Sequence, residues 1–426
     1  MKKIVLILLF SFPILQCMAQ ICDHYFHYSD YKASAGIDLN YEFNSTSVTN
    51  KFLDNFLFGN HIDSRDKQWM FAGLRPHNTF GADVEGGISF VTFPDTFVGN
   101  SNMGLFVKYN KYYHADLTFT RDLFELFFDG NERFAGKDAD LGNSSLNVIN
   151  YEQFQIGILT KFGDAKMKHT FGIGVSINNG IQNTRVDIKN GNLFTDTNAE
   201  YLDLSANYDI YQSDTSKHGT NAFKGFGTSA NIYYSFITEN DNIFDFELTD
   251  FGFIEWNRHS QQFSKDTAFH FEGINVHDIL NIQGSIFDNA NPDSVVNSYT
   301  FSDTTMRYTM MTPACLRISY LYNYSRFFRM EFSFKKKFFS HYDPYFLVKT
   351  QLIPNKNNVF SFDFSYGGYS SSNPVINHNG NFGIEYAHNF GRGMVMLVGT
   401  NYLNGFIYPY STTGQGAFVT LKKYFL

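Results

Sequence analysis

The sequence predicts an all-β protein: a transmembrane antiparallel β-barrel of about 14–16 strands with long extracellular loops and one or two short helices. Three observations lead to this prediction. The chain of 426 residues opens with a secretion signal, Met1–Ala19. No later stretch approaches the roughly 18 apolar residues that a membrane-crossing helix needs. Segments of about ten residues with alternating apolar and polar side chains follow instead, as in strands that cross a membrane within a closed barrel.

The N-terminus has the three parts of a signal peptide. Two lysines precede the apolar run Ile4–Leu15, and cleavage is expected after Ala19. We therefore predict an N-terminal segment at 20–33 and a barrel over 34–426, in the outer membrane of a bacterial cell.

The composition agrees with a barrel and excludes some other classes. Aromatic residues make up 18% of the chain, with 49 Phe and 27 Tyr, which favours lipid-facing bands and aromatic girdles at both membrane interfaces. A net charge of -8 argues against nucleic acid as a partner. Three cysteines, one of them inside the signal, cannot form a disulfide framework.

Strands are indicated wherever side chains alternate with a period of two, because successive side chains of a strand point to opposite faces. The apolar residues of each run would face lipid and the polar residues the lumen. The clearest apolar sets are Phe171 to Ile177, Leu202 to Ile210, Phe226 to Phe236, Leu316 to Tyr322, Phe328 to Phe334 and Phe360 to Tyr366.

Turn signals divide these runs and allow the connections to be assigned to sides of the membrane. If both termini are periplasmic, the long connections 44–78, 120–146 and 277–307 lie on the extracellular side of the membrane. About sixteen segments result, but the short Glu239–Asn242 would then be an outer turn and the long 213–223 an inner one. Fourteen strands therefore stay open as an alternative.

Two helices are expected within these outer connections. Asp122–Phe128 is amphipathic, with Asp122 in its first turn and Gly130 placed to end it. Asp278–Phe287 is the weaker of the two.

The segment 44–78 is too apolar for a solvated loop, since each large apolar side chain gains roughly 1.5–3 kcal/mol on burial. We predict that Phe52, Phe56 and Phe58 fold inward as a plug and narrow the pore. The alternative is that 66–75 forms another lipid-facing strand.

Charged residues on the polar faces of the strands are candidates for lining the lumen. Mixed signs favour a network of ion pairs over a ring that selects one ion. The candidates are Arg317, Arg329, Glu331, Lys349, Asp363 and Glu385. Lys336 continues a lipid-facing set and is expected at the outer end of its strand, where its ammonium group can reach the interface and lipopolysaccharide phosphates.

No motif predicts catalysis, a cofactor or a metal. Cys22, His24, His27 and Asp30 have the residue types of a Zn²⁺ or copper site, and Asp288–Asp293 offers oxygen ligands for Ca²⁺. A solvated tail and a solvated loop tip explain them more simply. There is no Gly-x-Ser-x-Gly elbow and no His-Glu-x-x-His sequence.

Several pieces of the chain together resemble a known family. They are Asp250–Asn257, Asp129–Asn131 after a short helix, Tyr201–Ser205 and Phe271-x-Gly273-Ile274, followed by plain hairpins. From about residue 80 to 426 the chain resembles an uncharacterised outer-membrane barrel family of Bacteroidota, broadly similar to long-chain fatty-acid transporter-type barrels. The resemblance implies fold and location, and no catalytic residues.

These observations predict a channel or transporter for small or amphipathic molecules. A non-transporting scaffold of a secretion or glycan-uptake complex is the alternative, and an outer-membrane lipid hydrolase a second one. The expected partners are outer-membrane lipid, lipopolysaccharide, the barrel-assembly machinery and a further outer-membrane protein.

Overall fold

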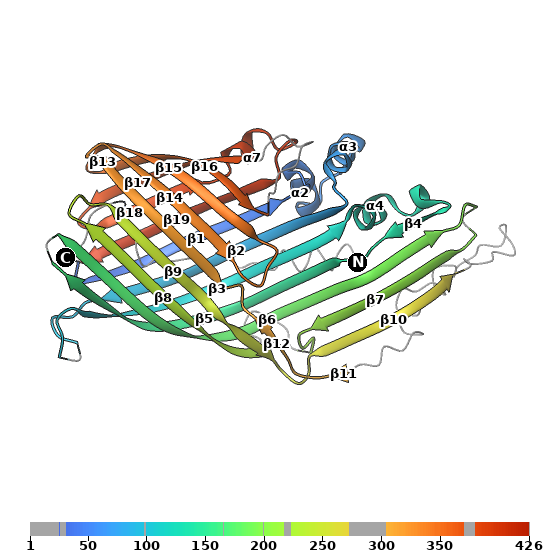
Figure 1. Ribbon diagram of the computed structural model, residues 1–426, viewed down its shortest axis with the longest axis horizontal. Coiled ribbons are helices and arrows are strands. Elements are labelled where there is room, and N and C mark those ends of the chain that lie inside the picture. Colours follow the sequence, from blue (N-terminus) through green and yellow to red (C-terminus); the bar gives the residue numbers. More distant parts are fainter. Residues whose placement is uncertain are drawn as a thin grey trace.

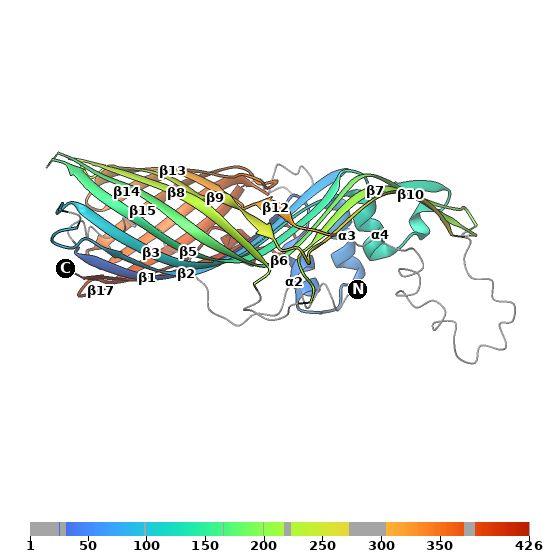
Figure 2. The same ribbon diagram turned by 90° about the horizontal axis from the view of Figure 1, so that it is seen from below.

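The computed structural model has one antiparallel sheet that closes on itself (Figures 1 and 2). It describes residue 25 and residues 31–97, 99–164, 166–198, 200–216, 223–271, 304–369 and 380–425. Within these ranges fourteen strands form the barrel wall. In order around the wall they are β1 (Ala33–Ser45), β2 (His77–Thr92), β3 (Met103–Thr120), β5 (Ser144–Gly163), β6 (Met167–Thr195), β8 (Gly225–Thr238), β9 (Ile243–Trp256), β13 (Cys315–Ser325), β14 (Phe328–Lys337), β15 (Asp343–Asn355), β16 (Asn358–Gly368), β17 (Gly380–Gly391), β18 (Met394–Thr400) and β19 (Gly414–Phe425).

The first and last strands close the barrel. β1 pairs with β19 from Ala33↔Phe425 to Asn44↔Gly414, and it pairs with β2 along its other edge. Closure satisfies the backbone N–H and C=O groups that an open edge would expose to lipid. The predicted fold class is confirmed, with the smaller of the two predicted strand numbers.

The sixteen-segment count was wrong because two strands lie beyond the wall. β7 (Leu202–Gln212) pairs with Thr184–Thr195 of the long β6 and with β10 (Gln261–Phe271). Both run past the barrel, away from the end where the C-terminus lies (Figure 1). The turn 239–242 therefore joins β8 to β9 at the same end as the C-terminus, opposite to its predicted side, and residues 213–216, which follow β7, lie at the other end.

We call the end where β1 begins and β19 ends the terminal end, and the opposite end the helix end. The helix end carries α2 (Asn50–Leu57), α3 (Ser64–Gly73), α4 (Arg121–Asp129), a 3-10 turn at Glu132–Phe134 and α7 (Leu403–Ile407). Three short strands add to the sheet near this end. β4 (Lys137–Asp140) pairs with β6, β11 (Thr304–Thr305) with β10, and β12 (Tyr308–Met311) with β9. No helix in the described ranges is long and apolar enough to cross a membrane.

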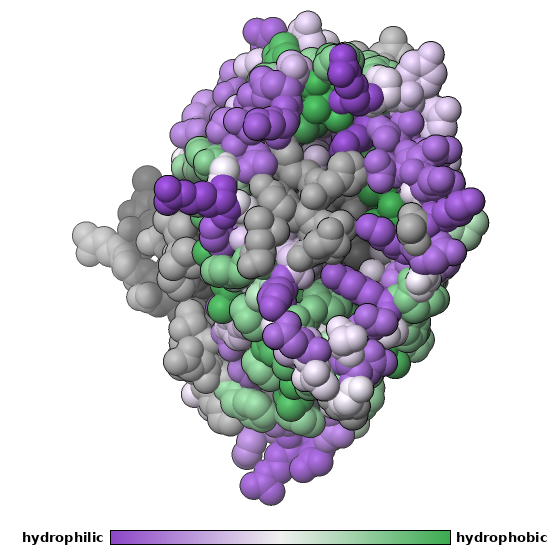
Figure 3. Space-filling view, turned by 90° about the vertical axis from the view of Figure 1, so that its left-hand side faces the viewer, coloured by the Kyte–Doolittle hydropathy of each residue, from purple (hydrophilic) through white to green (hydrophobic). Residues whose placement is uncertain are grey.

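The two faces of the wall differ as the period of two predicts. On β6, Ile173 is 45% and Val175 62% exposed on the outside, whereas Ser176 and Asn178 face inward and are 2% and 0% exposed. The same division holds on β16 and β17, where the outward phenylalanines are exposed. Hydrophilic residues gather around the rim of the terminal end, with apolar residues between them (Figure 3). An apolar outside and a polar inside are the arrangement of a barrel in lipid.

Three helices build a small apolar core at the helix end. Thr49 caps α2, Asp63 and Asp66 form a capping box on α3, and Thr120 caps α4. Gly130, with φ of 82°, ends α4, so the helix predicted at Asp122–Phe128 is confirmed. Their shared core consists of Val48, Phe52, Leu53, Met70, Phe71, Leu74, Phe119 and Phe124.

The alternative of a strand at 66–75 was wrong, because α3 occupies most of that segment. Other predictions lie outside the described residues: the signal 1–19, the Cys22–Asp30 cluster, the helix Asp278–Phe287 and the loop Asp288–Asp293.

Candidate functional site: the charged interior of the barrel

The barrel encloses a cavity of about 320 Å³. Inward side chains from strands all around the wall line it, among them Asp38 of β1, Lys108 of β3, Glu247 of β9 and Arg317 of β13. Alternation explains this concentration of charge, because each strand gives the lumen only the polar half of its residues. The cavity is the candidate functional site.

Four of the six predicted lumen residues form one ion-pair chain. The Lys349 ammonium lies 3.6 Å from a Glu331 carboxylate oxygen and also contacts Glu385. An Arg317 guanidinium nitrogen lies 3.4 Å from the other Glu331 oxygen. Arg329 and Asp363 are likewise buried on inward faces. The structure thus places all six on the inner wall, while their role in solute passage stays a prediction.

Tyr25 lies inside the lumen against the same chain. Its hydroxyl donates to Glu385 and accepts from the Lys349 ammonium at 3.2 Å. Its backbone carbonyl accepts a hydrogen bond from Arg329 at 3.4 Å. Since Tyr31 packs between Phe93 and Tyr424 at the terminal end, the chain reaches into the barrel before β1 begins.

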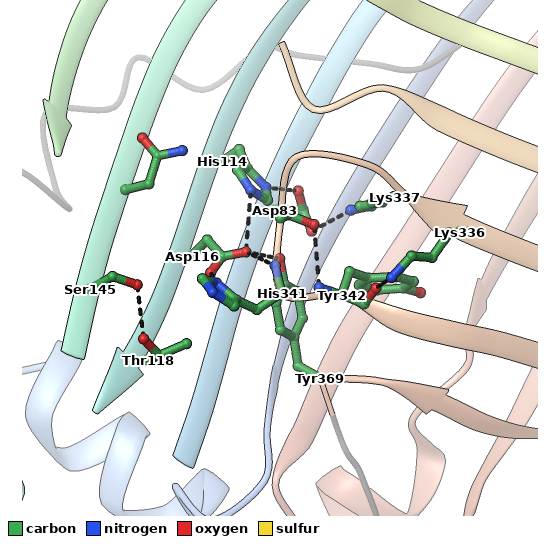
Figure 4. A network of polar contacts seen from close by, with 12 residues as sticks. Asp83, His114, Asp116, Thr118, Ser145, Lys336, Lys337, His341, Tyr342 and Tyr369 are labelled. Atoms are coloured by element: carbon green, nitrogen blue, oxygen red, sulfur yellow. Dashed lines mark hydrogen bonds and ion pairs between the residues drawn. The ribbon is translucent and has the colours of Figure 1, made fainter. Parts of the chain in front are cut away.

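A second network crosses the lumen near the helix end (Figure 4). On β2, Asp83 contacts the Lys337 ammonium from β14 and lies 2.7 Å from Nδ1 of His114 on β3. Six strands separate β2 from β14 in either direction around the described wall, so these two side chains meet from opposite sides. Lys337 and Asp83 are 4% and 5% exposed, which makes this a buried ion pair.

The loop 338–342 between β14 and β15 extends this network. His341 makes two contacts with the Asp116 carboxylate of β3. Its ring Nδ1 lies 2.5 Å from one oxygen, and its backbone N–H donates to the other at 2.7 Å. Tyr369 follows β16, and its hydroxyl donates to the same Asp116 carboxylate at 3.2 Å. The Tyr369 ring fits only because Gly81 has no side chain: a Cβ there would lie 1.9 Å from the ring.

We call Asp83, His114, Asp116, Lys337, His341 and Tyr369 the cross-lumen network. It ties the 338–342 loop, with the fully buried Tyr342, across the lumen to the wall of β2 and β3. The hydrogen bond to Asp116 raises the pKa of His341 above its ordinary value, because it favours the protonated ring. With the ring protonated, this contact is charge-assisted and stronger than a neutral hydrogen bond.

A β-bulge shapes the wall beside the cavity. Asp250 has a φ of 60°, which is uncommon for a residue with a side chain, and the register of β8 and β9 shifts beside it. Its N–H donates to Asn231 at 2.8 Å, and its carboxylate accepts from Gln153 at 2.6 Å. The bulge thereby turns a carboxylate into the lumen.

The three predicted plug residues lie on or beside the helices of the helix end. Phe52 is buried in the core of α2, α3 and α4, Phe56 lies against Phe128, and Phe58 is 68% exposed. None of these three phenylalanines is among the described residues that line the cavity. That they narrow a pore stays a prediction.

The three lysines at the end of β14 divide between the two faces. Lys336 lies at the helix end, where its ammonium donates to the Tyr342 carbonyl, and that this end faces outside stays a prediction. Lys335 and Lys337 point inward, and Lys335 lies 3.6 Å from Glu42 of β1. A contact of Lys336 with lipopolysaccharide stays a prediction.

Sequence reasoning missed most of the cross-lumen network. Asp83, His114 and Asp116 lie at alternate positions of clear strands, so their inward direction could have been inferred. Their partners could not, because Lys337 is 254 residues from Asp83 in the chain.

Comparison with known proteins gives a family and three weak likenesses in structure. The model of a family of unknown function (DUF5723) matches residues 28–384. No curated protein matches the chain in sequence. Similar solved structures include the Ralstonia pickettii toluene transporter TbuX (TM-score 0.43, 8% identity, 93% of this chain and 90% of that one). Another is a Pseudomonas aeruginosa FadL homologue (TM-score 0.42, 9% identity, 92% of this chain and 90% of that one). A third is the P. putida toluene transporter TodX (TM-score 0.41, 7% identity, 93% of this chain and 90% of that one). Likenesses this weak decide nothing about what the present chain binds.

Proposed function

The chain belongs to this family of unknown function, and we propose that it is an outer-membrane channel for small solutes, closed in this structure by contacts across its lumen. The observation that carries the proposal is the pairing of an apolar outer face with a charged internal cavity of about 320 Å³. A cavity inside the wall that is lined by charged side chains is the kind of space through which a small polar solute can pass.

The proposal includes export by the signal 1–19, insertion in the outer membrane and an origin in Bacteroidota. The apolar band supports a bilayer location because it would be costly in water, and the closed wall agrees with it because it leaves no unpaired sheet edge in lipid. Membrane fractionation, with heat-dependent migration on gels, tests this part. A species that stays soluble without detergent would contradict it.

Closure is proposed to depend on the cross-lumen network. Asp83 and Lys337 hold opposite walls together, and His341 holds the intervening loop against β3. Tyr25 also occupies the lumen, against Lys349 and Glu385. A solute that crosses the barrel must displace both groups of contacts.

Planar-bilayer recording and liposome swelling on the purified protein test transport. The Asp83→Asn/Lys337→Met double variant removes both charges of the buried pair, and we expect higher conductance than in the wild type. The matched control is Lys32→Met/Asp95→Asn, which removes an exposed pair with a 2.8 Å contact outside the lumen. We expect no change from it. If neither the wild type nor the first double variant conducts ions or passes solute, the channel proposal is wrong.

One observation favours the scaffold alternative as a second candidate. The sheet formed by β4, β6, β7 and β10 continues beyond the barrel, where it could contact another protein (Figure 2). Cross-linking in the intact membrane, followed by mass spectrometry, distinguishes the two functions. A stable partner together with absent conductance would favour the scaffold.

A further inference from the structure

The cavity lining has a marked excess of acidic side chains. Nine carboxyl groups line it, against five lysine or arginine groups. The acidic residues are Asp38, Glu42, Asp83, Glu85, Asp245, Glu247, Asp250, Glu331 and Glu385; the basic ones are Lys108, Arg317, Lys335, Lys337 and Lys349. A low-dielectric wall around such an excess produces a negative potential in the cavity.

Four of the five basic groups are already engaged by carboxylates. Lys335 lies by Glu42, Lys337 by Asp83, and both Arg317 and Lys349 by Glu331. These cations therefore leave little positive charge for a passing anion. The fifth, Lys108, lies 5.1 Å from the centre of the Tyr233 ring, and the carboxylates of Glu247 and Asp38 attract it.

A second, independent observation concerns hydrogen bonding. The side-chain carbonyl oxygens of Asn110 and Gln351 are buried and have no hydrogen-bond donor among the described residues. Both residues line the cavity, and they are 4% and 3% exposed. The Asn110 amide donates to Tyr112 at 3.2 Å and to Gln153 at 3.4 Å, so its oxygen is left to accept. A buried acceptor without a donor is costly, and a solute with N–H groups would satisfy it once the side chain turns toward the cavity.

We infer that the cavity admits small cations that donate hydrogen bonds, of the class of primary ammonium compounds, and disfavours small anions. The inference rests on the proposed channel function and names its solute class. Negative potential attracts the positive charge of such a solute, and the free carbonyl oxygens accept its N–H groups. The cavity volume, at the small end for ligand-binding pockets, suits a compact solute.

Reversal potentials in planar bilayers test the inference. Recordings use first a KCl gradient and then a gradient of ethylammonium propionate, whose two organic ions carry opposite charges. The protein is the full chain, as the wild type and as the Asp83→Asn/Lys337→Met variant. We expect reversal potentials that report K⁺ over Cl⁻ and ethylammonium over propionate.

Two variants examine the lining directly. Glu247→Gln and Asp38→Asn each remove one carboxylate, from β9 and β1, and each should move the reversal potential toward zero. Asp266→Asn is the matched control, because it removes an exposed carboxylate on β10, beyond the barrel. It should leave the reversal potential unchanged.

The possible failures are distinguishable. Conductance with a reversal potential at zero, or of the sign for anions, overturns the cation inference and leaves the channel function intact. An equal shift in Glu247→Gln, Asp38→Asn and Asp266→Asn also overturns it, because net charge and not the lining would then set selectivity. Absence of conductance in both the wild type and the double variant overturns the channel function and, with it, this inference.

Discussion

Lys337→Met should destabilise the protein strongly, because it breaks a buried ion pair from one side. The Lys337 and Asp83 side chains are 4% and 5% exposed, so water screens their attraction little. Removing one partner of such a pair costs about 3–5 kcal/mol, because the other charge stays buried without it. His114, 2.7 Å from Asp83, retains part of the stabilisation, so we expect about 3 kcal/mol, the lower end of that range.

Urea unfolding in lipid vesicles measures this loss as a change in the free energy of unfolding. The chain has two tryptophans, and Trp256, fully buried inside the barrel, reports on the wall. Asp83→Asn/Lys337→Met should lose less than Lys337→Met alone, because no uncompensated carboxylate remains.

Lys32→Met is the matched control. Lys32 and Asp95 lie 2.8 Å apart, but their side chains are 66% and 85% exposed, and exposed pairs contribute little. If Lys337→Met is no more destabilising than Lys32→Met, the buried contact across the lumen does not exist in the membrane.

Three further outcomes are expected. Ile173→Arg, in the exposed apolar run of β6, should cost about 2–4 kcal/mol of unfolding free energy, and Phe390→Arg near the terminal end about 0–1 kcal/mol; equal costs would contradict a membrane-buried band. The raised pKa of His341 means that its charged contact stabilises the closed loop fully below its ordinary value of 6.5 and is lost as pH rises through the raised value. Conductance should therefore rise as the pH passes through that raised value, and His341→Gln should lose this pH dependence; an unchanged profile would exclude His341 from closure. Gly81→Ala should destabilise the protein by displacing the Tyr369 ring, and in a Tyr369→Ala background it should cost much less; additive costs would mean that the two residues do not touch.

The sequence alone determined the class of fold and the direction of most side chains. Alternation on β6 and β16 separates lipid-facing from inward residues because successive side chains of a strand must point to opposite faces. The same rule placed Arg317 and Glu331 on the inner wall. It also located α4, since a cap, an amphipathic run and a following glycine are all local signals.

The tertiary structure decided the number of wall strands. β7 and β10 alternate like the others, and their period does not depend on whether they pair within the wall or beyond it. It also decided which face of the last strand points outward: Phe425 lies on the outside and Tyr424 is buried inside. Register with β1 fixes that choice, and a register between strands at opposite ends of the chain has no local signal.

The contacts that close the lumen belong wholly to the tertiary structure. Asp83 meets Lys337 and Asp116 meets His341 because barrel closure brings β2 and β3 opposite β14, more than 220 residues away in the chain. The sequence shows that these side chains carry charge and, by alternation, that the strand residues among them face inward. Which inward charges meet depends on the number of strands and their registers, which only the closed sheet determines.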